Sequence, residues 1–478
     1  MNLSKTESAP SLADRLITYG QSGAYPFHMP GHKRQCHPFF DPYTMDITEI
    51  YGFDNLHHAE GILLEAQQRA AALYHASETF YLVNGSTCGI LAAVAAATKR
   101  GGKLLMARNC HKAAYHAALL NNLEVSYLYP AADMTRGLSG AIAPDEVERM
   151  LKKDASLRTV LITSPTYDGV CSDVRRIAEI VHQYDGILIV DEAHGAHFGM
   201  HPYFPEHALA CGADLVINSV HKTLPSLTQT ALLHVQGMRV DRERLKRFLG
   251  MYQTSSPSYV LMAGIDACVR MLLEHGPELF DTFAKRLEGL RKQLFCMQAL
   301  ELVRGTEPEL GAYDYDRSKI LVATHRSGIA GPELSGMLRS RYQLEMEMDS
   351  EHYVTAITTV ADTKEGLQRL AEALAAIDSE LERQPGKPAR PFAAWENEAV
   401  LRIGEVAEAG KKSMLLAKSE GSISAEFVYL YPPGIPLLVP GERISGELLE
   451  KLLQYRANGF ALEGMADYRG EKIQIVKA

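Results

Sequence analysis

The sequence predicts an α/β protein with a mostly parallel sheet that helices cover on both faces. From about residue 60 to residue 235, short aliphatic and β-branched runs alternate with amphipathic stretches long enough to form crossover helices. The runs are apolar at nearly every position, which is typical of strands buried on both faces. Ligands of such doubly wound sheets bind beyond the carboxyl ends of the strands. Functional residues are therefore expected directly after each run.

Seven strands are expected in this region. They are residues 79–83 (TFYLV), 104–107 (LLMA), 123–129 (LEVSYLY), 159–163 (TVLIT), 187–192 (ILIVDE), 214–220 (DLVINSV) and 229–235 (QTALLHV). Two connecting helices are expected at residues 88–100 (CGILAAVAAATKR) and 174–184 (VRRIAEIVHQY), because their lengths suit crossovers between parallel strands.

The chain is expected to divide into four parts: residues 1–58, 59–300, 301–382 and 392–478. The second part is the large α/β domain, which ends in two longer helical regions at about 258–300. The third is a smaller α+β domain. Residues 382–396 (ERQPGKPARPFAAWE) combine proline, glycine and charge, which is typical of a linker to the C-terminal domain.

The composition excludes several classes of protein. The net charge of −9 over 478 residues argues against non-specific nucleic-acid binding and is compatible with a cationic small-molecule substrate. The seven cysteines are widely spread and contain no C-x-x-C pair, which favours a reducing compartment. The N-terminus lacks the order of a secretory signal, and no apolar stretch is long enough to span a bilayer. A cytoplasmic protein without membrane or nucleic-acid partners is expected.

The first candidate motif is VNGSTCGI (83–90), where a strand gives way to a helix through a loop of small residues. The helix N-terminus offers free N–H groups, Ser86 and Thr87 add hydroxyls, and Gly85 allows close backbone approach. This combination predicts a phosphate site. A plain helix cap would explain either hydroxyl alone. The motif matches neither a P-loop nor G-x-G-x-x-G, so a nucleotide is disfavoured.

The second motif is ILIVDEAHGAHFG (187–199), which places Asp191 at the end of a buried strand. A carboxylate there can pair with a protonated pyridine nitrogen and so keep the ring a strong electron sink. Asp191 could instead cap the next helix, or ligate a metal together with His194 or His197. No further cluster with ligand spacing accompanies these residues, so no metal site is expected.

The third motif is INSVHKT (217–223), in which Lys222 follows His221 at another strand end. A lysine in a partly desolvated pocket beside another cationic group loses its proton more readily and becomes able to form a Schiff base. A single lysine is usually a solvated surface charge. Here Asp191 and the phosphate motif precede it, and the three together would hold both ends of one ring and bond its aldehyde.

The sequences SVHKT, VDEAHGAH, NGST and FHMPGHKR (27–34) together resemble the fold type I pyridoxal-phosphate enzymes, the aspartate aminotransferase-like group. The nearest resemblance is to the ornithine/lysine/arginine decarboxylase family, from MPGHK through YPPGIPLLVPGE (431–442). Nothing before MPGHK could form an extra N-terminal domain, so the chain resembles the short bacterial form. FHMPGHKR would either close the site or contribute to a dimer contact.

The resemblance implies a role for each motif residue. Ser86 and Thr87 would bind the phosphate of pyridoxal 5′-phosphate together with Ser219, and Asp191 would pair with the pyridine nitrogen. Lys222 would hold the cofactor as a Schiff base.

Three further residues would surround the cofactor. His111, in ARNCHKAAYHA, resembles the histidine that stacks on the ring, Ala193 would lie under the other face, and His221 precedes the lysine. Without the resemblance, His111 would be interpreted as a surface histidine at a helix N-terminus.

Two segments bear on the substrate and on assembly. MYQTSSPSY (251–259) is similar to a stretch that reaches the cofactor phosphate of a neighbouring subunit, which would make Thr254 and Ser255 cross-subunit ligands and a homodimer, or a higher homo-oligomer, the active form. Glu442 could meet the substrate's distal ammonium or guanidinium group. A surface loop glutamate is an equal interpretation of Glu442.

The function implied is decarboxylation of a basic L-amino acid to CO₂ and a polyamine precursor. Arginine is favoured over lysine because the short forms resemble biosynthetic polyamine enzymes, and ornithine stays open. Either Lys222 or His221 would return a proton to the α-carbon. The alternatives are another fold type I enzyme, such as an aminotransferase, aldolase or β-eliminating lyase, and a non-catalytic cofactor-binding regulatory protein. MPGHK and YPPGIPLLVPGE argue against the first, and the absence of a DNA-binding motif argues against the second.

Overall fold

The computed structural model describes residues 11–35, 41–386, 391, 395–430 and 434–477. All seven expected strands are present and form one sheet in the order β2-β11-β10-β9-β7-β3-β4. In chain order they are β2 (Glu78–Leu82), β3 (Lys103–Ala107), β4 (Glu124–Leu128), β7 (Thr159–Thr163), β9 (Ile187–Asp191), β10 (Leu215–Asn218) and β11 (Ala231–Val235). β10 ends before the expected boundary, because residues 219 and 220 already belong to the next helix and its cap. The α/β fold class is confirmed.

The sheet is parallel except for β11, which runs antiparallel to both β10 and β2. The register pairs Thr163 with Asp191 and Ile217 with Asp191 across neighbouring parallel strands. The carboxyl ends of β7, β9 and β10 therefore lie side by side. The candidate motifs follow these ends and the end of β2.

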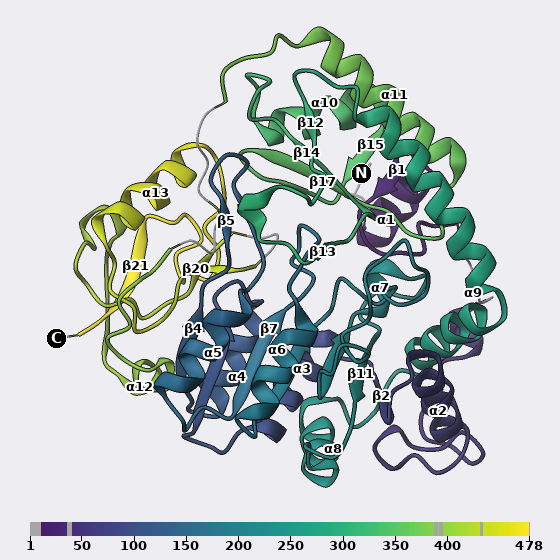
Figure 1. Ribbon diagram of the computed structural model, residues 1–478, viewed down its shortest axis with the longest axis vertical. Coiled ribbons are helices and arrows are strands. Elements are labelled where there is room, and N and C mark those ends of the chain that lie inside the picture. The colour runs from purple at the N-terminus through teal and green to yellow at the C-terminus, as the bar shows by residue number, and fades with distance from the viewer. Residues whose placement is uncertain (1–10, 36–40, 387–390, 392–394, 431–433, 478) are drawn as a thin grey trace, which may run out of the picture.

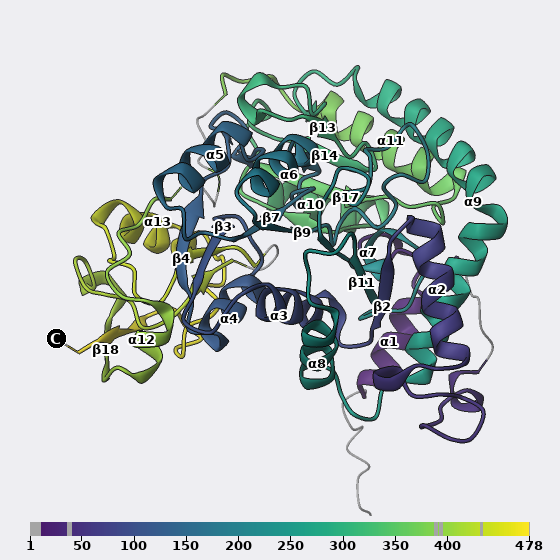
Figure 2. The ribbon, with the colours of Figure 1, turned by 60° about the horizontal axis from the view of Figure 1, so that its bottom comes forward.

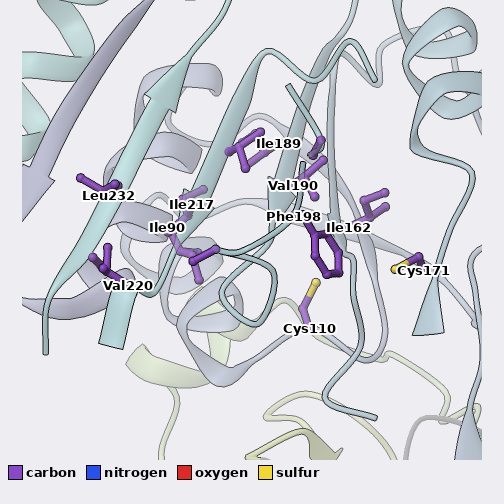
Figure 3. Packing of buried hydrophobic residues seen from close by; sticks show 14 of the residues in the cluster. Ile90, Cys110, Ile162, Cys171, Ile189, Val190, Phe198, Ile217, Val220 and Leu232 are labelled. Carbon is purple, nitrogen blue, oxygen red and sulfur yellow. The ribbon is translucent and has the colours of Figure 1, made fainter. Parts of the chain in front are cut away.

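Helices cover both faces of this sheet, with α3 and α4 on one side and α5 and α6 on the other (Figure 2). The helices of this part are α2 (Ile62–Tyr74), α3 (Gly85–Ala97), α4 (Lys112–Leu120), α5 (Pro144–Lys153), α6 (Val174–Gln183), α7 (Val220–Thr223) and α8 (Arg242–Tyr252). Ile90 of α3 packs with Ile217 and Leu232 of the sheet in the main core (Figure 3). Each fully buried aliphatic side chain of this kind contributes about 2 kcal/mol to folding.

One long helix, α9 (Tyr259–Leu294), replaces the two helical regions expected at about 258–300. Pro277 lies inside it and removes one backbone hydrogen bond, yet the helix continues. Leu272 and Phe280, on either side of the proline, are both buried in the core. Packing on both sides therefore offsets the local cost. In Figure 1, α9 runs along one edge of the molecule from the large sheet to the smaller one.

The smaller sheet has the order β12-β14-β17-β16 and is antiparallel. Its strands and helices are β12 (Glu301–Leu302), β14 (Lys319–Ala323), α10 (Gly331–Tyr342), β15 (Leu344–Met346), β16 (Met348–Asp349), β17 (Tyr353–Ile357) and α11 (Lys364–Glu380), with β15 outside the four-stranded sheet. The N-terminal elements α1 (Leu12–Gln21) and β1 (Tyr25–Phe27) lie beside it, because β1 pairs in parallel with β15 (Figure 1). Two short ribbons, β5 (Ala132–Asp133) with β6 (Leu138–Ser139) and β8 (Val170–Cys171) with β13 (Asp314–Tyr315), complete this region.

The C-terminal part has its own core, which includes Trp395, Leu437, Leu452 and Ile473. Its elements are α12 (Ile403–Glu408), β18 (Lys411–Leu415), β19 (Val428–Tyr429), β20 (Pro436–Leu438), α13 (Gly446–Ala457) and β21 (Lys472–Val476). α12 packs on α4, so this part lies beside the β4 edge of the large sheet.

Residues 431–433 of the proline-rich segment, and residues 387–390 and 392–394 of the expected linker, lie outside the described residues. The predicted division of the chain into four parts stays a prediction. Within the described ranges, no helix combines the length and the apolar character needed to cross a membrane.

Candidate active site

A cavity of about 370 Å³ opens at the carboxyl ends of the parallel strands. It brings together residues at the strand ends of the large sheet, Met29 of the N-terminal segment, Glu347 directly after β15 and Ile435 of the C-terminal part. Its lining residues are Met29, Gly85, Ser86, Thr87, Ile90, Asn109, His111, Thr163, Pro165, Tyr167, Asp191, Ala193, His194, His221, Lys222, Thr228, Glu347 and Ile435. Eight of the predicted cofactor-binding and catalytic residues are in this set: Gly85, Ser86, Thr87, His111, Asp191, Ala193, His221 and Lys222.

The first wall of the cavity is the N-terminus of α3. The helix begins at Gly85, whose φ of 75° is a conformation that glycine adopts without strain. The N-cap Asn84 makes no side-chain hydrogen bond to the helix, so the first N–H groups receive no cap. Ser86 and Thr87 add hydroxyls at the same end. This wall can bind a phosphate.

Asp191 ends β9 and is only 4 % exposed. Its Oδ1 accepts a hydrogen bond from the backbone N–H of Ala193 at 3.2 Å. Burial raises the pKa of the Asp191 carboxyl, and the Lys222 amine opposes that rise. A buried carboxylate facing a cavity is stabilised when a cationic partner, such as a protonated ring nitrogen, binds beside it.

Lys222 lies in the single turn of α7 that follows β10, with its amine toward the cavity. Its Nζ lies 3.0 Å from Nε2 of His194. Burial lowers the pKa of Lys222, while Asp191 and Glu347 oppose that shift. The amine is therefore closer to its uncharged, nucleophilic form than a surface lysine would be.

The two other predicted histidines also face the cavity. His111 caps α4, with Nδ1 accepting from the N–H of Ala113 at 3.2 Å, so it occupies a helix N-terminus and the cavity wall at once. Burial, together with the Lys222 amine, lowers the pKa of His111 to about 3. Nδ1 of His221 lies 2.9 Å from the carbonyl oxygen of Thr230, and burial lowers the pKa of His221 to about 4. Both imidazoles are neutral at pH 7.

Three predicted cofactor ligands do not line the cavity. Ser219 caps α7 and is fully buried, and its Oγ has no hydrogen-bond partner among the described residues. Thr254 and Ser255 lie on an exposed turn after α8. The backbone N–H of Thr254 donates to Oδ1 of Asn84 at 3.2 Å, so this turn lies beside the N-terminus of α3 but outside the cavity of its own chain.

Glu442 is not where the sequence predicted it. It does not line the cavity, and at 2 % exposure it is not a surface residue either. One carboxylate oxygen accepts from the N–H of Val439 at 2.9 Å and from Asn397 at 2.8 Å, and it lies 3.5 Å from the guanidinium of Arg108. The buried Arg108 draws the carboxylate inward, and we correct the expected substrate contact accordingly.

The cavity contains one carboxylate besides Asp191, namely Glu347, which sequence patterns missed. Glu347 follows β15; its Oε1 accepts from the hydroxyl of Tyr167 at 2.6 Å and its Oε2 from the N–H of Met29 at 2.7 Å. No local pattern marks Glu347, because the segment LEMEMDS alternates like any strand with one exposed face. Only the parallel pairing of β1 with β15 brings it to the site.

The motif FHMPGHKR packs against the lysine turn. The N–H of Gly31 donates to the carbonyl oxygen of His221 at 2.6 Å. The carbonyl oxygen of Gly31 accepts from the hydroxyl of Thr359 at 2.6 Å. Lys33 is buried and donates to the carbonyls of His28 and Ile357. The motif therefore connects α7 to the smaller sheet and places Met29 in the cavity wall.

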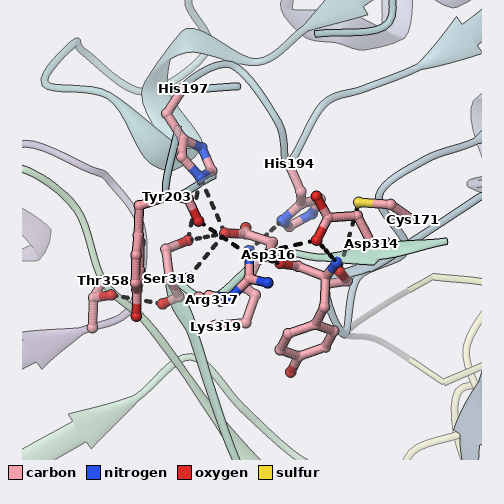
Figure 4. A network of polar contacts seen from close by, with 12 residues as sticks. Cys171, His194, His197, Tyr203, Asp314, Asp316, Arg317, Ser318, Lys319 and Thr358 are labelled. Carbon is pink, nitrogen blue, oxygen red and sulfur yellow. Dashed lines mark hydrogen bonds and ion pairs between the residues drawn. The ribbon is translucent and has the colours of Figure 1, made fainter. Parts of the chain in front are cut away.

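The two histidines considered as metal ligands, His194 and His197, contact different groups. His194 lies between the amines of Lys222 and Lys319, whereas His197 lies 3.1 Å from Oδ1 of Asp316 (Figure 4). Their imidazoles thus have separate partners. In the part of the chain that the structure describes, no three histidine, cysteine or acidic side chains gather as a metal site would require.

The residues present fit pyridoxal phosphate. The cavity offers an uncapped helix N-terminus for a phosphate, a buried carboxylate for a ring nitrogen and an amine of lowered pKa for an aldehyde. In addition, Oδ1 of the buried Asn109 faces the cavity region without a hydrogen-bond partner among the described residues. A buried acceptor of this kind is expected where the polar group of a ligand binds.

Comparisons with known families agree with this fit. The family model described as Orn/Lys/Arg decarboxylase, major domain, matches residues 10–312. The model of the Orn/Lys/Arg decarboxylase C-terminal domain matches residues 399–461. The two matches together contain the lining residues of the large sheet and Glu442.

Individual relatives are similar along nearly the whole chain. An uncharacterized protein of Bacillus subtilis, YaaO, is 33 % identical over 91 % of this chain and 92 % of its own length. An arginine decarboxylase of Halalkalibacterium halodurans is 30 % identical over 99 % of both chains. The solved structure of the E. coli constitutive lysine decarboxylase shares the fold, with a TM-score of 0.78 at 19 % identity over 98 % of this chain and 82 % of that one.

Proposed function

The chain belongs to the Orn/Lys/Arg decarboxylase family, and from this premise we propose that it removes the α-carboxylate of L-arginine. The reaction class, decarboxylation of a basic amino acid by a carbon–carbon lyase, follows from the family. The choice of arginine is supported by the 30 % identity to an arginine decarboxylase along the full length of both chains. The product would then be a precursor of polyamines.

The observation that carries the proposal is the position of the Lys222 amine. It lies in a cavity with the uncapped N-terminus of α3 at one wall and the buried carboxylate of Asp191 at another. We propose that Ser86, Thr87 and the N–H groups of α3 bind the cofactor phosphate, that Asp191 pairs with the ring nitrogen and that Lys222 bonds the aldehyde. Ser219, with its unpaired buried hydroxyl, is proposed as a further phosphate ligand.

When bound, pyridoxal phosphate supplies a conjugated ring that accepts the electron pair left at the α-carbon as CO₂ departs. The negative charge of Asp191 holds a proton on a basic nitrogen placed against it. Ala193 and His111 are proposed to lie on opposite faces of the cofactor ring and so to orient it. The largely buried setting excludes water from the reacting atoms.

We assign the final protonation of the α-carbon to Lys222 rather than to His221. Nδ1 of His221 carries its proton toward the carbonyl of Thr230, and its pKa of about 4 leaves Nε2 without a proton at pH 7. The Lys222 amine, once displaced by the substrate, is free to take up a proton and deliver it.

Glu347 is proposed to bind the cationic end of the substrate. It and Asp191 are the carboxylates among the described residues that line the cavity, and Asp191 is assigned to the cofactor. The hydrogen bonds from Tyr167 and from the N–H of Met29 hold the Glu347 carboxylate in place. A fixed carboxylate is the partner that a guanidinium or ammonium group requires.

A homodimer is proposed as the active unit, with the site at the subunit interface. Thr254 and Ser255 lie exposed at the surface, where a neighbouring subunit's cofactor phosphate could reach them. The described cysteines Cys88, Cys110, Cys171, Cys211 and Cys296 carry free thiols, which supports a reducing, cytoplasmic location.

The decisive experiment supplies the purified protein and pyridoxal phosphate with arginine, lysine and ornithine in separate reactions. Release of CO₂ with the matching amine is expected, and fastest from arginine. Lys222→Ala should abolish both the yellow bound cofactor and turnover, whereas Lys285→Ala, which removes an exposed lysine of α9, should leave both unchanged.

Two outcomes would refute the proposal. Formation of a keto acid without CO₂ would make the protein an aminotransferase, and a yellow, active Lys222→Ala protein would exclude Lys222 as the bonding residue. Faster release from lysine or ornithine would overturn only the choice of arginine.

A further inference from the structure

Three nitrogen groups lie in a row that begins in the cavity wall and leads into the interior. Nε2 of His194 lies 3.0 Å from Nζ of Lys222, and Nδ1 of the same ring lies 3.0 Å from Nζ of Lys319. Lys319 is the first residue of β14, is fully buried and does not line the cavity. Its contact with His194 is drawn in Figure 4. One imidazole therefore joins the proposed cofactor lysine to a second lysine that does not line the cavity.

Counting hydrogens restricts the charges in this row. A neutral imidazole carries one N–H and one acceptor nitrogen, whereas an ammonium group can only donate. Burial and the neighbouring Lys222 and Lys319 amines hold the pKa of His194 well below its usual value, so the ring is neutral. Both hydrogen bonds can form only if the lysine that faces the N–H of the ring is an uncharged amine, while the other lysine donates to the acceptor nitrogen and does so most strongly as an ammonium group.

The surroundings of Lys319 favour an amine that can change its charge near neutral pH. Burial lowers the pKa of Lys319 to about 8. The charged groups that act on it are Asp316 and Glu347, which raise the pKa, and Lys222 and Lys33, which lower it. The stem of Lys319 packs on Gly169, where a Cβ would come within 2.9 Å of its Cγ. The amine is thereby held against His194.

The ring of His194 is also fixed in place. The aromatic ring of Tyr167 lies against it, with 4.7 Å between the ring centroids. Besides the two lysines, His221 and His111 act on its charge. Because the imidazole cannot turn away from its partners, a change of proton on one nitrogen is transmitted to the other.

We propose that Lys222, His194 and Lys319 form a proton relay, with Lys319 as a positioning residue that acts on Lys222 through His194. In the first state, ammonium Lys319 donates to Nδ1, and the Nε2–H of His194 donates to the uncharged amine of Lys222. In the second state, one proton has passed from Lys319 to Nδ1 while the proton of Nε2 has passed to Lys222. The ring stays neutral, and the total number of protons is unchanged.

The relay serves both tasks of Lys222, and in this it rests on the proposed function. The first state presents an uncharged amine that can bond an aldehyde. The second state supplies the ammonium group that returns a proton to the α-carbon. Lys319 is thus the source of the proton that Lys222 delivers.

The test compares Lys319→Met, Lys319→Arg and, as a matched control, Arg317→Met. Arg317 lies two residues earlier, and its side chain is 41 % exposed. The first measurement is the rate at which cofactor-free protein bonds pyridoxal phosphate as a function of pH, followed by absorbance. The second is turnover. Thermal melting shows which variants are folded.

Lys319→Met removes the positive donor, so Lys222 should keep its proton to higher pH, and the midpoint of the bonding rate should rise by about one pH unit. Its turnover should fall about a hundredfold, the size of a lost proton transfer. Lys319→Arg keeps the donor but cannot give up its proton, so the midpoint should stay near that of the wild type while turnover falls. Arg317→Met should shift neither.

The relay is wrong if Lys319→Met leaves the bonding midpoint where the control leaves it, or if Lys319→Arg turns over at the wild-type rate. These failures differ from failure of the proposed function, in which the wild-type protein would not bond the cofactor through Lys222 at all.

Discussion

At the scale of single residues, the half-buried carboxylate of Glu347 and the buried carboxylate of Glu442 have different partners. Glu347 faces the cavity and accepts from Tyr167 and Met29, whereas Glu442 compensates the charge of the buried Arg108. Arg108 also donates to the hydroxyl of Tyr115 at 2.8 Å, so it cannot leave its position without breaking other contacts. The two glutamates can therefore be told apart by one matched pair of substitutions.

Glu347→Gln is expected to raise the KM for arginine about thirtyfold, because a charge-assisted hydrogen bond to a cation is worth about 2 kcal/mol. The amide still accepts from a neighbour, so the free energy of unfolding should change little. Steady-state kinetics and thermal melting measure the two quantities.

Glu442→Gln provides the comparison. It leaves Arg108 charged and unpaired in the interior, which should lower the free energy of unfolding by about 3 kcal/mol while the KM of the remaining folded enzyme stays the same. A large change in KM from Glu442→Gln, with none from Glu347→Gln, would restore the substrate contact that the sequence indicated for Glu442.

The residues that the sequence predicted in the cavity share one property, which is that they follow the ends of apolar strands or cap the next helix. Asp191 and Lys222 could be found in this way, since β-branched runs show where parallel strands stop. Lys319 and Glu347 could not, because Lys319 begins β14 of the smaller sheet, Glu347 follows β15, and both reach the site through tertiary packing. Glu442 was misplaced because nothing in the local sequence reveals that Arg108 lies beside it.

At the scale of elements, the contact between FHMPGHKR and α7 links the N-terminal segment to the lysine turn. A Cβ on Gly31 would lie 2.6 Å from the carbonyl oxygen and 2.9 Å from the nitrogen of Leu224, which directly follows α7. These are backbone atoms and cannot turn aside. Only glycine permits this approach.

Gly31→Ala should therefore displace the turn that bears Lys222. We expect weaker cofactor binding, measured by absorbance titration, and a loss of about 2 kcal/mol in the free energy of unfolding, which is typical of overpacking. Gly289→Ala in α9 is the control, because a Cβ there meets nothing within 4 Å. Equal behaviour of the two alanine variants would show that the close approach has no functional consequence.

The strands of the large sheet could be predicted because each is a continuous apolar run, a signal contained within about five residues. The helix α9 was divided wrongly, since burial on both sides of Pro277 is a tertiary effect that a sequence window does not contain. The pairing of β1 with β15 could not be foreseen either, because it joins segments that lie far apart in the sequence, with Tyr25 opposite Leu344.

At the scale of the whole molecule, the cavity opens between parts of the chain that are far apart in sequence. The exposed turn of Thr254 and Ser255 lies beside the N-terminus of α3, because the N–H of Thr254 donates to Oδ1 of Asn84. If two chains place these turns toward each other's phosphate sites, each active site contains residues of both subunits. Mutations in different subunits can then compensate for each other.

Co-expression of two inactive subunits under separate tags tests this arrangement. One subunit carries Lys222→Ala and the other carries Thr254→Ala with Ser255→Ala. In a heterodimer, one site combines the intact lysine of one chain with the intact hydroxyls of the other, and the second site carries both defects. Since half of randomly formed dimers are mixed and each has one intact site, about a quarter of wild-type turnover should return.

Pairing Lys222→Ala with Asp191→Asn is the control. Both residues belong to the same subunit's wall, so each site of the mixed dimer has one defect and activity should stay absent. Recovery confined to the first pair requires a shared site, whereas a mixture no more active than its parents would place Thr254 and Ser255 outside it.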